Sequence, residues 1–259
     1  MQAFLDSMPA FFLIFARVSG LFMTAPVLGS RNVYGRARVA LALTLAFIIA
    51  PLVPVDPAVY AMDLVPYTAA IVKELLVGIT LGFSAMLLFN AVQLAGQILD
   101  VQVGFGIANV VDPLTSAQVP VMGQFQYILA ILLFLALNGH HLMIIALRQS
   151  FDLVPVSSFW FTPELATKFS AMGEDMFLMA LKVGAPSVGA LFLAEMALGM
   201  VARTVPQMNV FIVGIPMKIA LGFIIVLAAM PIFYTLMAHA FDSLFRDLIE
   251  LSRAMGATQ

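Results

Sequence analysis

The stretch LVPYTAAIVKELLVGITLGFSAMLLFNAVQLA, residues 64–95, decides the fold class of this 259-residue chain. About 20 consecutive apolar residues span the hydrocarbon core of a bilayer as a helix, and this run is longer than that. Other apolar runs of comparable character occur at 8–28, 37–55, 119–147, 176–201 and 210–241. The sequence therefore predicts an all-α, multi-helix, membrane-associated protein.

The composition argues against a soluble protein. Hydrophobic residues make up 63% of the chain and charged residues only 10%, against about 25% charged residues in an average soluble domain. With 12 Lys and Arg and 14 Asp and Glu, the chain cannot cover a globular surface with polar side chains. It also lacks the basic patch that nucleic-acid binding needs, so we expect neither a soluble enzyme nor a nucleic-acid partner.

Ionised residues inside the predicted spans are costly and therefore informative. A central Arg or Lys costs about 2.5–3.5 kcal/mol on membrane insertion, whereas a Leu or Phe returns about 0.3–0.6 kcal/mol. Lys73 and Lys182 have two interpretations, either a functional role or a charged head that reaches water near an interface. Arg17 and Glu195 lie deeper, and we expect them to be buried and paired with other helices or subunits.

Two glycines in the decisive stretch indicate a close helix contact. Gly78 and Gly82 form a GxxxG pattern four residues after Glu74, so all three residues share one helix face. GxxxG alone is common in apolar helices, but a buried acid on the same face favours a helix–helix contact surface. We therefore predict such a contact along this face.

The segment GFGIANVVDPLTSAQVP, residues 104–120, interrupts the helical pattern. Its glycines and prolines disfavour a helix, and no alternation of apolar and polar residues indicates a strand. An irregular backbone at membrane depth must be buried in protein or line a cavity. The segment is thus either an apolar loop folded back on its own helices or a plug in a conduit.

Signals of catalysis and of metal binding are absent from the sequence. The chain has no HExxH, GxSxG or P-loop pattern, and no cysteine. His140 and His141 are adjacent and point to different faces of a helix, so they cannot chelate one metal ion as an i,i+4 pair does. We expect no enzymatic activity, no cofactor and no metal.

The segment VPQMNVFIVGIPMKIALG, residues 205–222, resembles a motif of the FliR family of type III secretion export-gate proteins. Further stretches fit the same family in the same order along nearly the whole chain. They are Arg17 with Pro26 and Arg31, Lys73-Glu74 with Gly78 and Gly82, Gly96-Gln97 with Asp100 and Gly104-Phe105, Asp112-Pro113, and Asn138-Gly139-His140 with Ser150.

The resemblance implies a single export-gate subunit, residues 1–259, built of long, kinked helical hairpins. It implies a P-like part at 1–175 that includes the loop 104–120, a Q-like helical hairpin at 176–240, and a polar tail at 241–259. Its implied location is the bacterial inner membrane, in the flagellar basal body, in contact with membrane lipid. The implied partners are P-type and Q-type gate subunits, the B-type switch subunit, the A-type export subunit, and unfolded flagellar export substrates.

The resemblance also suggests roles for individual residues. The loop 104–120 matches the family's channel plug, and its candidate plug residues are Phe105, Ile107, Val110, Val111, Asp112, Pro113 and Leu114. Candidate subunit contacts are Arg17, Glu74, Gly78, Gly82, Glu195, Pro206, Asn209, Pro216 and Lys218. An injectisome subunit and a stand-alone secondary transporter stay open as alternative functions.

Overall fold

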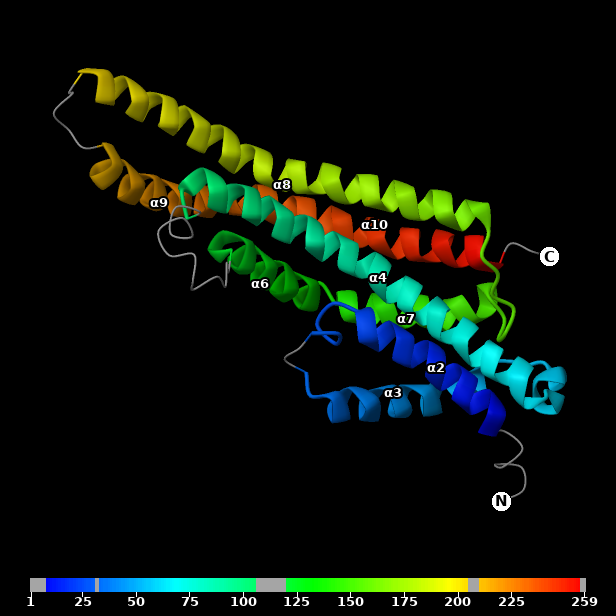
Figure 1. Cartoon of the computed structure of the whole chain (residues 1–259). Coiled ribbons are helices and arrows are strands. Elements are labelled where there is room, and N and C mark those ends of the chain that lie inside the picture. The colour runs from blue at the N-terminus through cyan, green and yellow to red at the C-terminus, as the bar shows by residue number, and fades with distance from the viewer. Residues whose placement is uncertain (1–7, 31–32, 106–119, 205–209, 257–259) are drawn as a thin grey trace. The chain divides into compact units, whose positions relative to one another are not determined.

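The computed structural model describes residues 8–30, 33–105, 120–204 and 210–256 and folds them as helices (Figure 1). Two short 3-10 helices, η1 (Ala50–Leu52) and η2 (Pro57–Ala61), follow α3. The described α-helices are α2 (Met8–Thr24), α3 (Gly35–Ile49), α4 (Leu64–Val103), α6 (Val121–Ala136), α7 (Gly139–Leu153), α8 (Pro163–Thr204), α9 (Val210–Ala228) and α10 (Met230–Gly256). No strand occurs in these ranges, and the predicted all-α fold is confirmed.

The chain divides into two compact units. The first consists of Met1–Leu87, Leu135–Gly173 and Phe241–Gln259, and the second of Leu88–Phe134 and Glu174–Ala240. The helices α4, α8 and α10 each contribute residues to both units. The division into a P-like part and a Q-like hairpin stays a prediction.

The core of the first unit forms around α2. Its buried apolar residues recur at helical spacing, and they are joined by buried residues of α4 and α7. Those that are fully buried include Leu13, Ile14, Leu81 and Leu147. Burying one such side chain stabilises the fold by roughly 1.5–3 kcal/mol.

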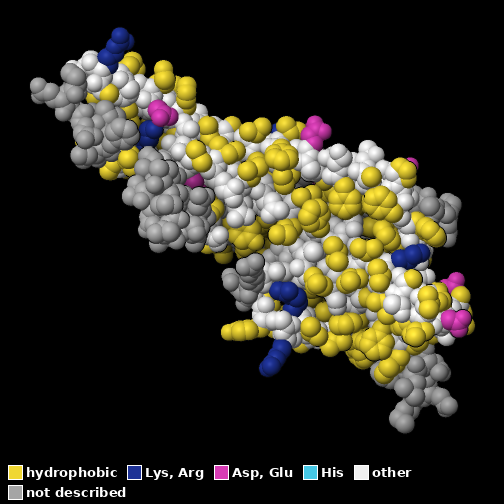
Figure 2. Space-filling view, viewed as in Figure 1, with side chains coloured by type: hydrophobic (Ala, Val, Ile, Leu, Met, Phe, Trp, Pro, Cys, Tyr) yellow, Lys and Arg dark blue, Asp and Glu magenta, His cyan; other side chains and the backbone are white. Residues whose placement is uncertain are grey.

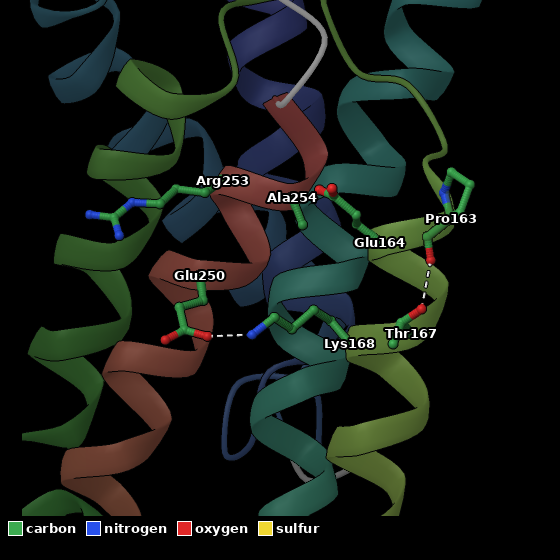
Figure 3. A pocket seen from close by; sticks show the side chains of 7 residues that line it. All are labelled: Pro163, Glu164, Thr167, Lys168, Glu250, Arg253 and Ala254. Carbon is green, nitrogen blue, oxygen red and sulfur yellow. Dashed lines mark hydrogen bonds and ion pairs between the residues drawn. The ribbon is translucent and has the colours of Figure 1, made fainter.

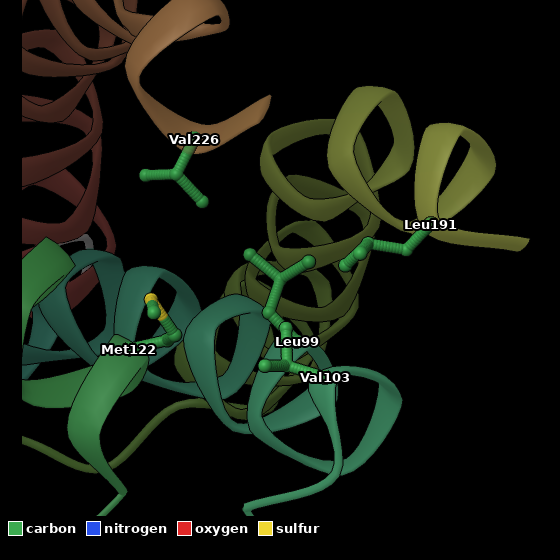
Figure 4. Packing of buried hydrophobic residues seen from close by; sticks show 5 residues of the cluster. All are labelled: Leu99, Val103, Met122, Leu191 and Val226. Carbon is green, nitrogen blue, oxygen red and sulfur yellow. The ribbon is translucent and has the colours of Figure 1, made fainter. Parts of the chain in front are cut away.

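The core of the second unit is a cluster contributed by four helices. It consists of Leu99 and Val103 of α4, Met122 of α6, Leu191 of α8 and Val226 of α9 (Figure 4). The end of α4 and the start of α6 meet in this cluster, so it lies beside both ends of the segment 106–119.

Several helices extend beyond the apolar runs; α4, for example, continues past 95 to Val103. The fifth run begins at 176, but α8 begins at Pro163, because the Thr162 hydroxyl accepts a hydrogen bond from the Leu165 amide at 3.2 Å and caps the helix. The polar tail from 241 continues α10 as far as Gly256. Its apolar residues Leu244, Leu248, Leu251 and Met255 are buried one turn apart, so this part of α10 is amphipathic.

The predicted run 119–147 is broken. The backbone at Asn138 is left-handed, with φ 58°, and separates α6 from α7. Asparagine tolerates this conformation better than most residues, and a glycine follows it.

Several of the described helices are long and apolar enough to cross a membrane. They are Gly35–Leu52, Leu64–Val103 and Pro163–Thr204, and counting the bent pairs α6–α7 and α9–α10 as single spans would bring the number to 5. Hydrophobic side chains cover much of the face seen in Figure 2, where ionised side chains are few. The exposed large apolar side chains of α3 are Val39, Leu41, Leu43, Phe47 and Ile48.

Candidate functional site

A fully buried ion pair joins α2 to α4 in the first unit. The Nε of Arg17 donates to Oε2 of Glu74 at 2.6 Å, and its Nη2 donates to Oε1 at 3.1 Å. Both side chains are 0% exposed. The guanidinium also lies over the Phe151 ring, 4.1 Å from its centroid. Since both charges are desolvated, removing either partner would leave the other charge uncompensated in the core.

Backbone groups in and beyond α7 complete this network. Nη1 of Arg17 donates to the Ser150 carbonyl at 2.9 Å and to its hydroxyl at 3.2 Å, and Nη2 donates to the Val154 carbonyl at 2.9 Å. Oε1 of Glu74 accepts from the Ser157 amide at 2.8 Å. The network therefore ties α2, α4 and the end of α7 together, and protein groups satisfy both charges.

Glycines allow α2 and α4 to approach closely enough for this pair to form. A Cβ on Gly78 would overlap the Arg17 carbonyl, and one on Gly20 would overlap the Leu75 carbonyl. A Cβ on Gly82 would overlap the Thr24 hydroxyl and the Leu21 carbonyl of α2. The helix–helix contact predicted from Gly78 and Gly82 is present, and its partner is α2 of the same chain. Sequence reasoning missed Gly20, which has no GxxxG partner to mark it.

The burial of Arg17 and Glu74 constrains how they can act on another subunit. Both side chains bond within this chain and neither reaches the surface. They can therefore affect a subunit contact only through the helices that they hold together.

A second ion pair lies on the surface of the second unit. Nζ of Lys218 on α9 donates to Oε1 of Glu195 on α8 at 2.6 Å, and Nε2 of Gln102 on α4 donates to Oε2 at 3.4 Å. The side chains of Lys218 and Glu195 are 22% and 50% exposed. Pro216 lies two residues before Lys218, inside α9. Unlike the buried pair, this pair can be reached from outside the chain. The prediction that Glu195 is buried is therefore wrong for this chain, whereas its predicted pairing with another helix is present.

Large apolar side chains are exposed on the two helices that carry the surface pair. So many exposed large apolar side chains are unusual for a soluble monomer and indicate contact with protein or lipid. On α8 they are Phe192, Leu193, Met196 and Met200, and on α9 they are Met217, Ile224 and Leu227.

A hollow of about 490 Å³ lies in the first unit between the start of α8 and the end of α10 (Figure 3). Nζ of Lys168 donates to Oε2 of Glu250 across it. The remaining lining residues are Pro163, Glu164, Thr167, Arg253 and Ala254. Acids and bases are balanced in this lining, so the hollow offers no excess charge to hold an ionic ligand.

Most of the candidate plug residues lie outside the described residues. Phe105 is described and packs against the Leu99 cluster. The plug candidates Ile107, Val110, Val111, Asp112, Pro113 and Leu114, and the contact candidates Pro206 and Asn209, fall in the undescribed segments 106–119 and 205–209. Within the described residues, no three His, Cys, Asp or Glu side chains gather as they would to hold a metal ion.

Comparisons with known proteins agree with the resemblance of the motifs. The family model "Bacterial export proteins, family 1" matches residues 8–244. The flagellar biosynthetic protein FliR of Bacillus subtilis (strain 168) is 39% identical over 261 residues, which cover 100% of both chains. The protein of the same name from Escherichia coli (strain K12) is 31% identical over 250 residues, 96% of this chain and 95% of its own. That of Aquifex aeolicus (strain VF5) is 29% identical over 237 residues, 90% of each.

Proposed function

Because this chain belongs to the FliR family of bacterial export proteins, we propose that it is the R-type subunit of the flagellar type III export gate. In this role it forms, with P-type and Q-type subunits, the channel through which unfolded flagellar proteins cross the inner membrane. The observation that carries the proposal is the 39% identity to a flagellar FliR along the whole of both chains. B-type and A-type export subunits are its further proposed partners.

The exposed apolar surface supports a subunit that works in an assembly. Large apolar side chains of α8 and α9, the helices that carry Glu195 and Lys218, are exposed in the single chain. An export gate offers sister subunits and lipid to cover them. A charged pair within such a surface favours protein partners over lipid, because hydrocarbon solvates ions poorly.

The buried network supports a structural role over transport of a small solute. A secondary transporter binds its substrate at a polar site near the middle of the membrane. Here the side chains of Arg17 and Glu74 form hydrogen bonds with each other and with Ser150, Val154 and Ser157. No charge of this pair is left to attract a substrate.

The segment 104–120 is our proposed channel plug. Its apolar residues would close a narrow conduit by excluding water, as hydrophobic constrictions do in channels. Asp112 and Pro113 would shape its turn. An apolar seal of this kind holds back ions, yet it yields to a passing unfolded chain without binding it tightly.

The gate assignment can be tested by co-expression with P-type and Q-type subunits from the same organism. We expect one complex, with a native mass that requires all three subunit types. A stable, monodisperse chain that purifies alone and ignores the other two subunits would contradict the assignment. Restoration of motility in Bacillus subtilis lacking its own FliR would support the flagellar branch.

The plug is tested separately by deleting residues 110–114 and measuring leakage of small solutes across the inner membrane. We expect increased leakage from a gate that still assembles. An assembled gate that leaks no more than the unmodified one would rule out the plug.

A further inference from the structure

Asp100 connects the end of α4 to the start of α6. Its Oδ1 accepts a hydrogen bond from the Met122 amide at 2.9 Å, and its Oδ2 accepts one from the Gly123 amide at 3.2 Å. The residue is 6% exposed, so water scarcely competes for the carboxylate. Each oxygen of one carboxylate thus holds a different amide of the first turn of α6.

This carboxylate takes the place of a local helix cap. The first amides of an α-helix have no partner within the helix, and a side chain just before the helix usually accepts from them. At the start of α6 that position is Pro120, which has no side-chain acceptor. The acceptor comes instead from 22 residues earlier in the chain, and its negative charge suits the positive end of the helix dipole.

The backbone carbonyl of Asp100 takes part in the hydrogen bonds that end α4. This carbonyl accepts from the Phe105 amide at 3.0 Å, while the Val101 carbonyl accepts from the Gly104 amide at 3.2 Å. This pattern is the Schellman ending of a helix, and the left-handed Gly104, with φ 98°, is the residue type that it favours. Asp100 therefore both terminates α4 and caps α6.

Tight packing surrounds this connection. One turn before Asp100, a Cβ on Gly96 would overlap the backbone of Gly123, so α4 and α6 touch there without intervening side chains. Leu99 and Met122, which are next to Asp100 and Gly123 in the chain, belong with Val103 to the apolar cluster of the second unit (Figure 4). The hydrogen bonds of Asp100 therefore lie beside closely packed backbone and apolar side chains, where little of the carboxylate is exposed.

We propose that Asp100 is a positioning residue that holds together the two ends of the segment 106–119, which follows Phe105 and precedes Pro120. Fixing both ends of a segment restricts the conformations that it can adopt. The effect on leakage rests on the proposed plug function, whereas the effect on the two helix ends does not. Loss of Asp100 should therefore leave a gate that assembles but seals poorly.

Two variants separate positioning from ordinary helix capping. Asp100→Ala removes the acceptor. Asp100→Ala combined with Pro120→Ser supplies a local cap for α6 and leaves α4 untied. We expect amide exchange at Met122 and Gly123 to become at least about tenfold faster in Asp100→Ala and to slow again in the combined variant. Leakage should rise in Asp100→Ala and stay raised in the combined variant.

A third readout is independent of the plug. Val101 and Val121 are exposed on the two helix ends, and the chain has no native cysteine, so spin labels can be attached at both positions. With cysteine-free partner subunits, we expect a narrow distribution of label distances in the unmodified gate and a broad one in both variants. A narrow distribution in Asp100→Ala overturns the proposal, and so does a return to normal leakage in the combined variant. A different result would separate the two proposals. If the distance distribution broadens in Asp100→Ala and in the combined variant, but neither Asp100→Ala nor the 110–114 deletion increases leakage, the plug function is wrong and the positioning role of Asp100 is supported.

Discussion

Arg17 and Glu74 lie 57 residues apart in the chain, yet they form an ion pair in which both side chains are 0% exposed. Removing water from two charges is expensive, and their attraction compensates for this only when the geometry is good and the remaining hydrogen bonds are made. Here the bidentate contact and the bonds to Ser150, Val154 and Ser157 meet both conditions. The pair therefore specifies which faces of α2 and α4 meet.

Replacing one partner of this pair should destabilise the first unit severely. Arg17→Met or Glu74→Met leaves one buried charge alone, which costs about 3–5 kcal/mol. The double replacement leaves no lone charge, so its loss should be clearly smaller than the sum of the two single losses. Thermal unfolding of the four proteins within the purified gate provides the comparison.

The exposed pair of Lys168 and Glu250 is the matched control for this cycle. Solvent screens it, so Lys168→Met and Glu250→Met should each change the unfolding midpoint little. Additive losses for Arg17 and Glu74 would show that the two charges are not coupled, against the observed contact.

Gly78→Ala should separate α2 from α4. The added methyl group would overlap the Arg17 carbonyl, which as backbone cannot rotate away. Such overpacking costs about 1–3 kcal/mol. Gly173→Ala is the control, because a Cβ there meets nothing within 4 Å, and a helical Gly→Ala change should stabilise by up to about 1 kcal/mol. A Gly78→Ala protein with an unchanged unfolding midpoint would contradict the close approach.

The helices of this fold are predictable from sequence only where they are apolar. Length and hydrophobicity indicate α4 from its start at Leu64 to 95, although not its last turns to Val103, because a long apolar run can be recognised without knowledge of its neighbours. The start of α8 escapes the same reasoning, since its first turns carry Glu164 and Lys168. There the cap at Thr162 and the proline after it give the signal. The extension of α10 is similarly hidden, because half of its surface is polar.

The candidate site shows the same limit. The sequence predicts that Glu74, Gly78 and Gly82 share one face, because this depends only on their spacing within one helix. Arg17 as the partner of Glu74 does not follow, because hydrophobic periodicity does not state which helices are neighbours. The role of Asp100 is hidden further, since its partners are backbone amides, and these leave no mark in a sequence.

Charge reversal at the surface pair of Glu195 and Lys218 should act on assembly more than on folding. In the single chain an exposed pair contributes about 0–1 kcal/mol, so Glu195→Lys should hardly move the unfolding midpoint. If sister subunits cover this surface, the variant should co-purify with less P-type and Q-type subunit, and the swap Glu195→Lys with Lys218→Glu should recover part of the loss. If Glu195→Lys co-purifies with the normal amount of both partner subunits, Glu195 and Lys218 do not take part in the subunit contacts.

Gln126 should be replaceable with a gain in stability. It is 4% exposed on α6, and its Oε1 has no hydrogen-bond partner. It lines a cavity of about 10 Å³ with Pro186 and Ser187 of α8 and with residues of α9 and α10. A buried polar atom without a partner costs about 1–3 kcal/mol, so Gln126→Met should remove this cost and keep the volume filled.

For a chain of this size, 1 kcal/mol raises the unfolding midpoint by about 2–4 °C, so a gain of about 1–3 kcal/mol predicts a rise of about 2–12 °C for Gln126→Met in the purified gate. Gln124→Met, on the exposed side of the same helix, controls for the general effect of a methionine. The opposite sign would be equally informative. A cavity of this volume is just large enough for one water molecule. A lower midpoint for Gln126→Met alone would show that the amide oxygen is satisfied by such a water, and that the contact of α6 with α8 is hydrated.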